Sequence, residues 1–340
     1  MIPGYEDLKE GARTFSPPIH TGEEKLYSLN QDKRPLHQYI LRRLLESILL
    51  LFVVALIVFA LGRATGNPTD LLVPDDATED EREMVKKALG LDRPYHVQLY
   101  IFMWGLMRGD FGDSIRYHQP ARDMFFERLP NTLKLLPGAV GLAVVIAIPL
   151  GVVAAVRRGT WIDKIAGGIA VFGVATPNFW VAIIGIYIFS VWLGVLPAGR
   201  MGGPSHYVLP TFTLGTFMMA GIMRLVRSSM LDVLDTEYVK LARIKGLAES
   251  KVVWKHCLRN ALIPVLTMFG VFMGLFITGA IVTETVFAWP GVGRLTFDAV
   301  IQRDYPLLQA VILLDAVLIL AINLVVDILY AYINPRIRFE

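Results

Sequence analysis

The sequence predicts an all-α polytopic membrane protein with six transmembrane helices. Hydrophobic residues make up 54% of the 340-residue chain and charged residues only 19%, whereas a soluble domain carries about 25% charged residues. The hydrophobic residues are gathered in blocks, several of which reach the roughly 20 residues that a helix needs to cross the hydrocarbon core. Lysine and arginine are concentrated between alternate blocks, which is the pattern of cytoplasmic connections.

Six apolar stretches supply these helices in chain order. They lie at 44–62, 135–156, 165–195, 208–223, 261–282 and 306–333. The third stretch is long and contains Pro177, so we expect it to be tilted or kinked. The fourth is the shortest of the six, with only "VLPTFTLGTFMMAGIM" to cross the core.

The connection at 63–134 is long enough to form a small external subdomain between the first and second spans. Its middle, "EREMVKKALGLDRPYHVQLYIFMWGLMRGDFGDSI", alternates helical patterning with a turn rich in glycine and aspartate. The remaining divisions are an N-terminal extension at 1–43, a five-span core at 135–333 and a C-terminus at 334–340. The polar composition of residues 1–38 is typical of a poorly ordered extension.

The distribution of basic residues predicts the orientation in the membrane. Twenty lysines and arginines lie on the side that even numbers of crossings share, in 1–43, 157–164, 224–260 and 334–340. Three lie on the other side, in the short connections 196–207 and 283–305. Because short cytoplasmic connections carry the excess of positive charge, we expect both termini and the loop at 228–260 to be cytoplasmic.

The polar loop between the fourth and fifth spans contains "DTEYVKLARIKGLAESKVVWKHCLRNALIP". Asp235 or Thr236 is a suitable N-cap and Gly246 a suitable C′ residue, so a short helix is predicted at 237–245. A second helix, from about Ser250, leads back into the membrane. The loop is either a two-helix protrusion that transmits a push to the spans or an interfacial segment whose basic residues meet anionic lipid heads.

The residue types exclude several chemistries. No Gly-x-x-x-x-Gly-Lys-Ser/Thr run occurs, so the sequence offers no phosphate-binding loop for nucleotide hydrolysis by this chain itself. The six histidines show no metal-ligand spacing, and the single cysteine, Cys257, cannot form an intramolecular disulfide. A net charge of +3 is too small to indicate nucleic acid as a partner. No Gly-x-Ser-x-Gly elbow or comparable constellation indicates an enzyme.

The segment "EYVKLARIKGLAESKVVWKHCLRNALIPVLTMFG" resembles the EAA loop of ABC-importer permeases, in particular the oligopeptide, dipeptide and nickel group. "GLDRPYHVQLYIFMWGLMRGDFGDSI", "GAIVTETVFAWPGVGRLTFDAVIQRDYP" and "NLVVDILYAYINPRIR" resemble the same group, so the likeness covers almost the whole chain. Within the EAA pattern, Ala242 holds the second alanine position and Gly246 the glycine position. Lys240, Leu241 and Arg259 stand where a glutamate, the first alanine and a proline are usual.

The resemblance implies a type I ABC importer permease fold in the cytoplasmic (inner) membrane of a bacterium or archaeon. The chain would form the translocation path for peptides or a related small solute. Its partners would be a second homologous permease, two cytoplasmic ATPase subunits, an external solute-binding protein and the lipid bilayer. It would bind no cofactor itself, because the ATPase subunits bind ATP and Mg. The short helix would be a coupling helix that acts through Glu237, Tyr238, Leu241, Ala242, Arg243, Lys245, Gly246 and Leu247.

Polar residues within the spans admit two interpretations. Asp315 and Asp327 lie in the sixth span, and Asn323 precedes Asp327 by one turn. Acidic groups at such depth usually face protein or water, so these residues either make contacts between helices or relay protons. In the first interpretation Asp327 pairs with Arg224 or Arg227 of the fourth span. In the second the chain is a proton-coupled secondary transporter.

The external turn "FAWPGVGR" likewise admits two interpretations. Its residues Trp289, Pro290, Gly291 and Arg294 are expected to form an external gate or a contact for the binding protein. A plain rigid turn is the alternative. Small residues at 215–217 and 269–274 are expected to allow close packing of the fourth and fifth spans.

Overall fold

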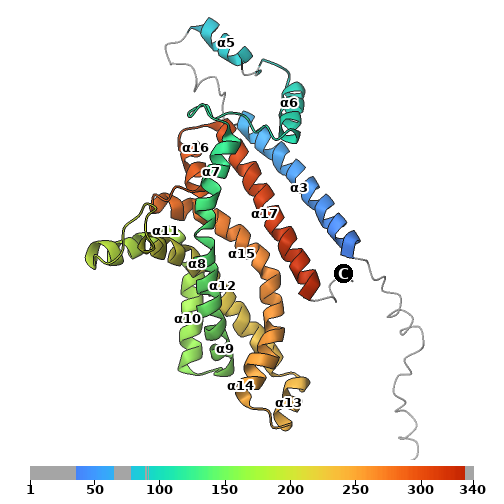
Figure 1. The fold of residues 1–340 in the computed structure, drawn as a ribbon, viewed down its shortest axis with the longest axis vertical. Coiled ribbons are helices and arrows are strands. Elements are labelled where there is room, and N and C mark those ends of the chain that lie inside the picture. Colours follow the sequence, from blue (N-terminus) through green and yellow to red (C-terminus); the bar gives the residue numbers. More distant parts are fainter. Residues whose placement is uncertain (1–35, 65–77, 89, 91, 334–340) are drawn as a thin grey trace, which may run out of the picture.

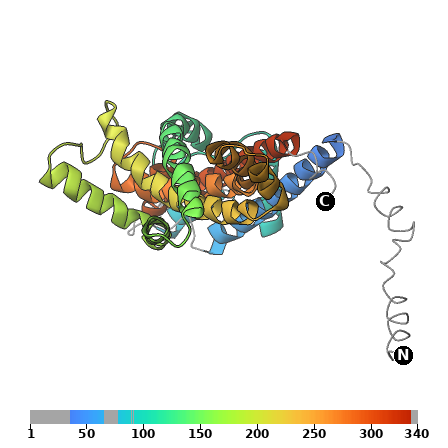
Figure 2. The same ribbon diagram turned by 90° about the horizontal axis from the view of Figure 1, so that it is seen from below.

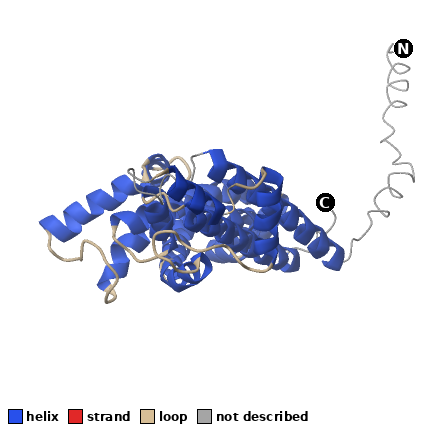
Figure 3. Ribbon diagram, turned by 90° about the horizontal axis from the view of Figure 1, so that it is seen from above, coloured by secondary structure: helices blue, strands red, loops and turns tan. Residues whose placement is uncertain are grey.

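The computed structural model describes residues 36–64, 78–88, 90 and 92–333 (Figure 1). The predicted N-terminal extension, up to residue 35, and the C-terminus at 334–340 lie outside the described residues. Within the described ranges every regular element is a helix, and strand-like pairing is limited to an isolated bridge between Asp113 and Pro120. Figure 3 shows the helices and the loops that join them. The predicted all-α class is confirmed.

In the described part of the chain, five helices are long and apolar enough to cross a membrane. They are Ile40–Arg63, Ala121–Val156, Ser205–Leu234, Glu249–Val286 and Tyr305–Ile328. Each overlaps one of the predicted spans. A sixth crossing results if a bent pair of shorter helices counts as one span.

The third predicted span, 165–195, is this bent pair, and the kink expected at Pro177 is a complete break in the helix. The axes of the two halves differ by 104°. Pro177 causes the break, because proline cannot donate a helical hydrogen bond and drives the preceding residue out of the helical region. Thr176 accordingly has extended dihedral angles, φ −87° and ψ 125°. The pieces are α10 (Trp161–Ala175), α11 (Asn178–Gly185) and the π-helical segment η3 (Ile186–Trp192).

The other helices extend beyond the apolar stretches that predict them. These are α3 (Leu36–Ala64), α12 (Ser205–Leu234), α15 (Leu258–Val286) and α17 (Tyr305–Ile333). The second span consists of α7 (Ala121–Leu133), α8 (Leu136–Leu142), η2 (Ala143–Ala147) and α9 (Ile148–Val156). The predicted external loop at 63–134 therefore contains α5 (Glu79–Ala88), α6 (Tyr95–Met107) and all of α7. Hydropathy marks where the hydrocarbon begins, whereas a helix continues until its backbone groups are capped.

The two largest hydrophobic cores in the described part of the chain hold most of the helices together. The larger core surrounds α12 and includes the buried side chains Met223 and Val226. The smaller core joins α7 to α16 (Val292–Ile301) and to the first turns of α17, through Phe125 and Leu295. Figure 1 shows α7 and α16 beside the upper end of α17. The molecule thus has an inner body around α12 and an outer body around α16.

α3 and the α11 region lie at opposite edges of the molecule (Figures 1 and 2). α3 packs along α17, where Gln309 Nε2 donates a hydrogen bond to the Val58 carbonyl at 3.1 Å. Large hydrophobic side chains of α3, such as Leu45 and Leu49, remain exposed. A membrane protein covers such surfaces with lipid or with another protein chain.

α9 approaches α12 closely because a glycine faces α12. A Cβ atom added to Gly151 would lie 2.8 Å from the Met223 carbonyl oxygen and 2.9 Å from Val226 Cβ. A Cβ atom does not come so close to non-bonded atoms, so α9 and α12 would have to separate. Small residues that let helix backbones approach are a common basis of helix association in membranes.

Gly151→Ala should therefore lower the stability of the purified protein. Overpacking of this kind costs about 1–3 kcal/mol, and thermal unfolding in detergent measures it. Gly168→Ala, in α10, is the matched control, because nothing lies within 4 Å of its added Cβ and alanine favours a helix over glycine. Equal unfolding temperatures for the two variants would contradict the close packing of α9 on α12.

Candidate functional site

The polar loop between α12 and α15 contains the predicted short helix, α13 (Glu237–Ile244). Thr236 Oγ1 donates a hydrogen bond to the Val233 carbonyl at 2.6 Å and so joins the start of α13 to the end of α12. Gly246 has φ +75° and reverses the chain after α13, as a C′ glycine does. The second predicted helix follows as α14 (Glu249–Lys251) and the π-helical segment η4 (Val252–Cys257), which runs into α15.

α13 is held in place from its inner side. Val239 is completely buried, and Ala242 and Leu247 pack partly buried against the same inner core. At the other end of the loop, Asn260 Nδ2 donates a hydrogen bond to the Tyr238 hydroxyl at 2.7 Å. The helix is therefore fixed both to α12 and to the start of α15.

An ion pair connects α13 to α14. Arg243 donates from Nη2 to Glu249 Oε1 at 2.7 Å and from Nε to Glu249 Oε2 at 3.2 Å. This hydrogen bonding raises the pKa of the Arg243 guanidinium, which stays charged. Because both side chains are exposed, the pair adds little stability, but its two-point geometry sets the orientation of the two helices.

α13 exposes an apolar stripe to its surroundings. Ile244 is 80% exposed, Leu241 55% and Tyr238 41%, and their three-residue spacing places them on successive turns of the helix. The charged residues Lys240 and Lys245 flank the stripe. Exposed hydrophobic side chains grouped on one helix mark a surface that contacts another protein or a membrane.

The residues predicted to act in coupling separate into two groups. The exposed ones are Glu237, Tyr238, Leu241, Arg243, Lys245 and Gly246. Ala242 and Leu247 instead pack inward and support the helix. The sequence prediction omits Ile244, the most exposed apolar side chain of α13, although its spacing from Leu241 indicates a shared face.

The external turn is bound tightly to the second span. Trp289 is completely buried, donates from Nε1 to the Asn131 carbonyl at 2.9 Å and meets the Tyr207 ring edge-on at 4.8 Å between centroids. Asn131 Nδ2 in turn donates to the Pro290 carbonyl at 3.0 Å. Trp289 and its neighbour Gly291 are buried in this structure, so neither offers a surface contact for a binding protein. The turn closes onto α7 and α12.

A buried carboxylate organises this turn. Glu284 is 0% exposed and accepts hydrogen bonds from Thr132 Oγ1 at 2.6 Å and from the Arg294 backbone N–H at 3.1 Å. The Val292 N–H donates to Thr132 Oγ1 at 2.9 Å. The carboxylate thus occupies the N-terminal end of α16, where free N–H groups attract negative charge. Gly291 leaves the space, since an added Cβ would lie 2.3 Å from a carboxylate oxygen of Glu284.

Asp304 plays a similar part at the start of α17. It is 2% exposed and accepts hydrogen bonds from Ser114 Oγ and from the N–H groups of Arg116 and Leu307. The sequence prediction names none of Glu284, Thr132 or Asp304. For Asp304 a signal exists, because an aspartate shortly before Pro306 is a typical helix start. The pairing of Thr132 with Glu284 joins residues 152 positions apart and has no local signal.

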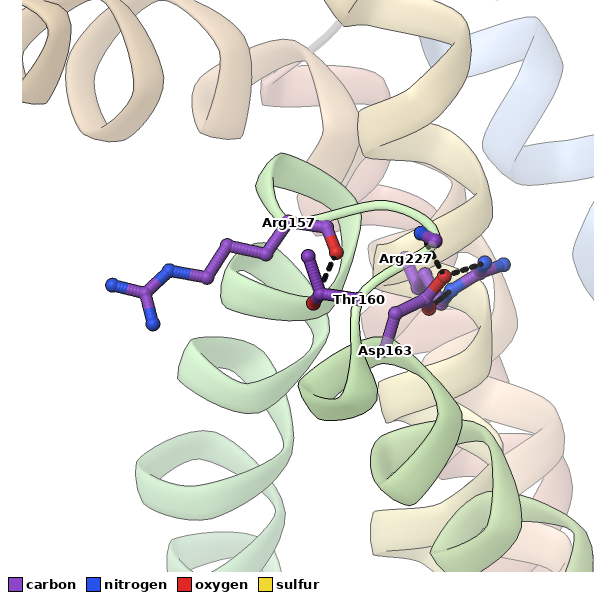
Figure 4. A network of polar contacts seen from close by, with 5 residues as sticks. Arg157, Thr160, Asp163 and Arg227 are labelled. Atoms are coloured by element: carbon purple, nitrogen blue, oxygen red, sulfur yellow. Dashed lines mark hydrogen bonds and ion pairs between the residues drawn. The ribbon is translucent and has the colours of Figure 1, made fainter.

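The polar residues of the spans pair differently from the prediction. Arg227 binds Asp163 of α10, from Nε to Oδ1 at 2.5 Å and from Nη2 to Oδ2 at 3.0 Å (Figure 4). Asp327 Oδ2 lies 3.3 Å from Arg43 Nε of α3. The predicted pairing of Asp327 with Arg224 or Arg227 is therefore wrong, because α17 packs on α3 at this end whereas α12 packs on α10.

The remaining polar residues of α17 lie partly buried within the helix bundle. Asn323 faces α15, where its Oδ1 atom would lie 2.6 Å from a Cβ added to Gly270. Asp315 is half-buried and lies 12 positions before Asp327, which corresponds to about 18 Å along a helix. The structure thus separates the two aspartates by several helical turns.

Comparison with known proteins agrees with this geometry. The family model "Binding-protein-dependent transport system inner membrane component" matches residues 147–339, and the model of the corresponding N-terminal region matches residues 36–136. The glutathione transport system permease protein GsiC of Escherichia coli (strain K12) is 42% identical over 303 residues, which cover 89% of this chain and 99% of that protein. The oligopeptide transport system permease protein AppB of Bacillus subtilis (strain 168) is 41% identical over 313 residues, covering 88% and 99%.

A solved structure shares the fold. An inward-facing conformation of the MetNI methionine ABC transporter contains a chain that matches with a TM-score of 0.53 and 17% sequence identity. The match covers 62% of this chain and 96% of that chain. At this identity the likeness concerns the arrangement of the helices alone.

Glu284→Met should lower stability, because a side chain of similar length without acceptor atoms leaves the Thr132 hydroxyl and the Arg294 N–H without their partner. Leaving buried donors unsatisfied costs about 1–3 kcal/mol, which thermal unfolding in detergent measures. Glu127→Met, at an exposed site of α7, is the control and should change stability by less than about 0.5 kcal/mol. If Glu284→Met were as stable as the control, the carboxylate would not hold the external turn.

Proposed function

The chain belongs to the family of binding-protein-dependent transport system inner membrane components, and from this membership we propose that it is a permease subunit of an ABC importer for peptides or a related small solute. With a second homologous permease it forms the translocation path. An external binding protein delivers the solute, and two cytoplasmic ATPase subunits supply the energy. The names of GsiC and AppB, a glutathione and an oligopeptide permease, support this class of solute.

The observation that carries this proposal is the rigid, apolar surface of α13. The helix is anchored at both ends in the spans α12 and α15, so it cannot be displaced without moving them. Its exposed stripe of Tyr238, Leu241 and Ile244 offers a partner a hydrophobic surface that has little side-chain freedom left to lose. An ATPase subunit that grips α13 would convert its own closure into a movement of the spans.

The chemistry of ATP hydrolysis belongs to the partners in this proposal. The sequence has no phosphate-binding Gly-x-x-x-x-Gly-Lys-Ser/Thr run, so ATP and Mg would be bound by the ATPase subunits. The permease would lie in the cytoplasmic membrane of a bacterium or archaeon with both termini cytoplasmic. The excess of lysine and arginine on the α13 side supports this orientation.

Proton coupling through the sixth span is disfavoured by the geometry. A relay needs groups close enough to pass a proton, whereas Asp315 and Asp327 are about 18 Å apart along α17. Asp327 is in addition paired with Arg43, which gives it a structural role. The relatives named above are transport permeases of the family to which this chain belongs.

The source of energy distinguishes the two mechanisms. In proteoliposomes that contain both permeases, the ATPase subunits and the binding protein, uptake of a labelled peptide should require internal ATP and should persist when an ionophore collapses the proton gradient. The control replaces ATP by a non-hydrolysable analogue and should show no uptake. Uptake that follows the proton gradient without ATP would exclude an ABC importer.

Arg243→Glu should reduce copurification of the ATPase subunits about tenfold, equivalent to roughly 1.4 kcal/mol of binding free energy. The substitution reverses the charge beside the apolar stripe and places two acidic side chains together. Glu249→Gln is the control, because it breaks the same ion pair without reversing a charge at position 243. The ratio of ATPase to permease in mild detergent reports the result, and equal ratios for wild type and Arg243→Glu would speak against docking at this side chain.

A further inference from the structure

The turn between α9 and α10 is built around one carboxylate. Gly159 has φ +80°, and its N–H donates a hydrogen bond to Asp163 Oδ2 at 2.9 Å. Thr160 Oγ1 donates to the Arg157 carbonyl at 2.6 Å and closes the same turn. Figure 4 shows the Asp163 carboxylate pointing from the first turn of α10 toward α12. With a residue exposure of 8%, this acid is held in one orientation.

Arg227, on α12, donates two hydrogen bonds to this carboxylate, from Nε to Oδ1 at 2.5 Å and from Nη2 to Oδ2 at 3.0 Å. Together with the Gly159 N–H, the carboxylate accepts three hydrogen bonds. A bidentate arginine pair fixes direction as well as distance, and a partly buried pair is screened less than an exposed one. The cytoplasmic end of α10 is therefore joined to α12 at a defined angle.

Close packing extends this connection along the helices. A Cβ added to Gly173 of α10 would lie 2.7 Å from Ala220 Cβ of α12, and Gly151 of α9 fits against α12 in the same way. α9, α10 and α12 pack as one unit. The ion pair joins α10 to α12 at one end, and the two glycines bring the backbones of α9 and α10 close to α12. α12 runs on into α13 through Thr236.

The other end of α10 leads into α11 and to a small cavity beside it. Beyond the break at Pro177, Asn178 begins α11 and lines a small cavity between α11, α12 and α15. The other side chains around this cavity include Met218, Phe272 and Phe276. A movement of α10 relative to α12 would change the shape of this cavity.

We propose that the Asp163–Arg227 pair is a positioning joint that makes α10, and α11 beyond it, follow the movements of α13 during transport. Asp163 and Arg227 touch neither solute nor nucleotide. The pair transmits movement from α12 to α10. A displacement of α13 moves α12 directly, because the two helices are consecutive, whereas it can move α10 only through the contacts between α10 and α12. This inference rests on the proposed function, in which an ATPase moves α13.

The first experiment uses the complete transporter in proteoliposomes and measures peptide uptake and ATP hydrolysis together. Asp163→Asn and Arg227→Gln should each reduce the number of peptides taken up per ATP hydrolysed at least fivefold, while the ATPase subunits copurify at the wild-type ratio. The double variant should lose no more than either single variant, because both remove the same contact. Glu83→Gln, which breaks the exposed Lys87–Glu83 pair of α5, is the control and should keep the wild-type ratio.

A second experiment tests whether rigidity at this place is sufficient. A variant with cysteine at 163 and 227 should lose coupling, and a short bifunctional thiol reagent that bridges the two positions should restore it. Cys257, the native cysteine of this chain, is completely buried, and a complex with native residues at 163 and 227 is treated with the same reagent as the control for thiols on the other subunits. Failure of the bridge to raise the ratio of uptake to hydrolysis would overturn the joint.

The outcomes separate this inference from the function beneath it. If the wild-type complex showed no ATP-dependent uptake, the proposed function itself would fail. If the wild type were ATP-driven and Asp163→Asn coupled equally well, only the joint would be overturned. Loss of ATPase copurification in the Asp163 or Arg227 variants would also overturn it, because the pair would then support assembly rather than coupling.

Discussion

The close packing of α12 is the constraint on which the rest of the structure depends. Half of the most apolar window of this helix is buried inside the molecule, more than for any other candidate span described. Glycines of α9 and α10 bring their backbones against it, and dispersion contacts of this density replace the hydrophobic driving force that is absent between helices in lipid. The same helix continues into α13, so the span with the largest buried share also carries the exposed apolar stripe of α13.

Buried charges position the elements that packing alone would leave free to rotate. Glu284 fixes the start of α16, Asp304 the start of α17 and Asp163 the start of α10. A carboxylate taken out of water is costly unless several donors satisfy it, and each of these accepts two or more hydrogen bonds from another part of the chain. A carboxylate that accepts several hydrogen bonds can take few orientations. These three carboxylates therefore fix how the helices of the inner and outer bodies lie against one another.

The sequence predicts the helical class, five of the spans and α13, because each rests on a local pattern: an apolar run, a cap or a C′ glycine such as Gly246. The bend of 104° at Pro177 exceeds the predicted kink, since a proline indicates a break but neighbouring helices decide its angle. The pairing of Asp327 fails for a related reason. The position of Asp327 along its span leaves several arginines at a similar depth as possible partners. The packing of α17 on α3 places Arg43, rather than the others, beside Asp327.

The break at Pro177 also determines what must surround it. Where α10 stops and α11 starts, Thr176 donates to the Phe172 carbonyl, and the N–H groups of Trp180 and Val181 donate to the Pro177 carbonyl. The other backbone groups at the two helix ends lack a partner within their own helix. Hydrocarbon offers nothing to replace those partners, and irregular backbone at membrane depth persists only beside protein or in a wetted space. Lipid acyl chains must therefore be excluded from the Thr176–Asn178 corner. Water bound there would offer a polar solute hydrogen-bonding partners inside the membrane.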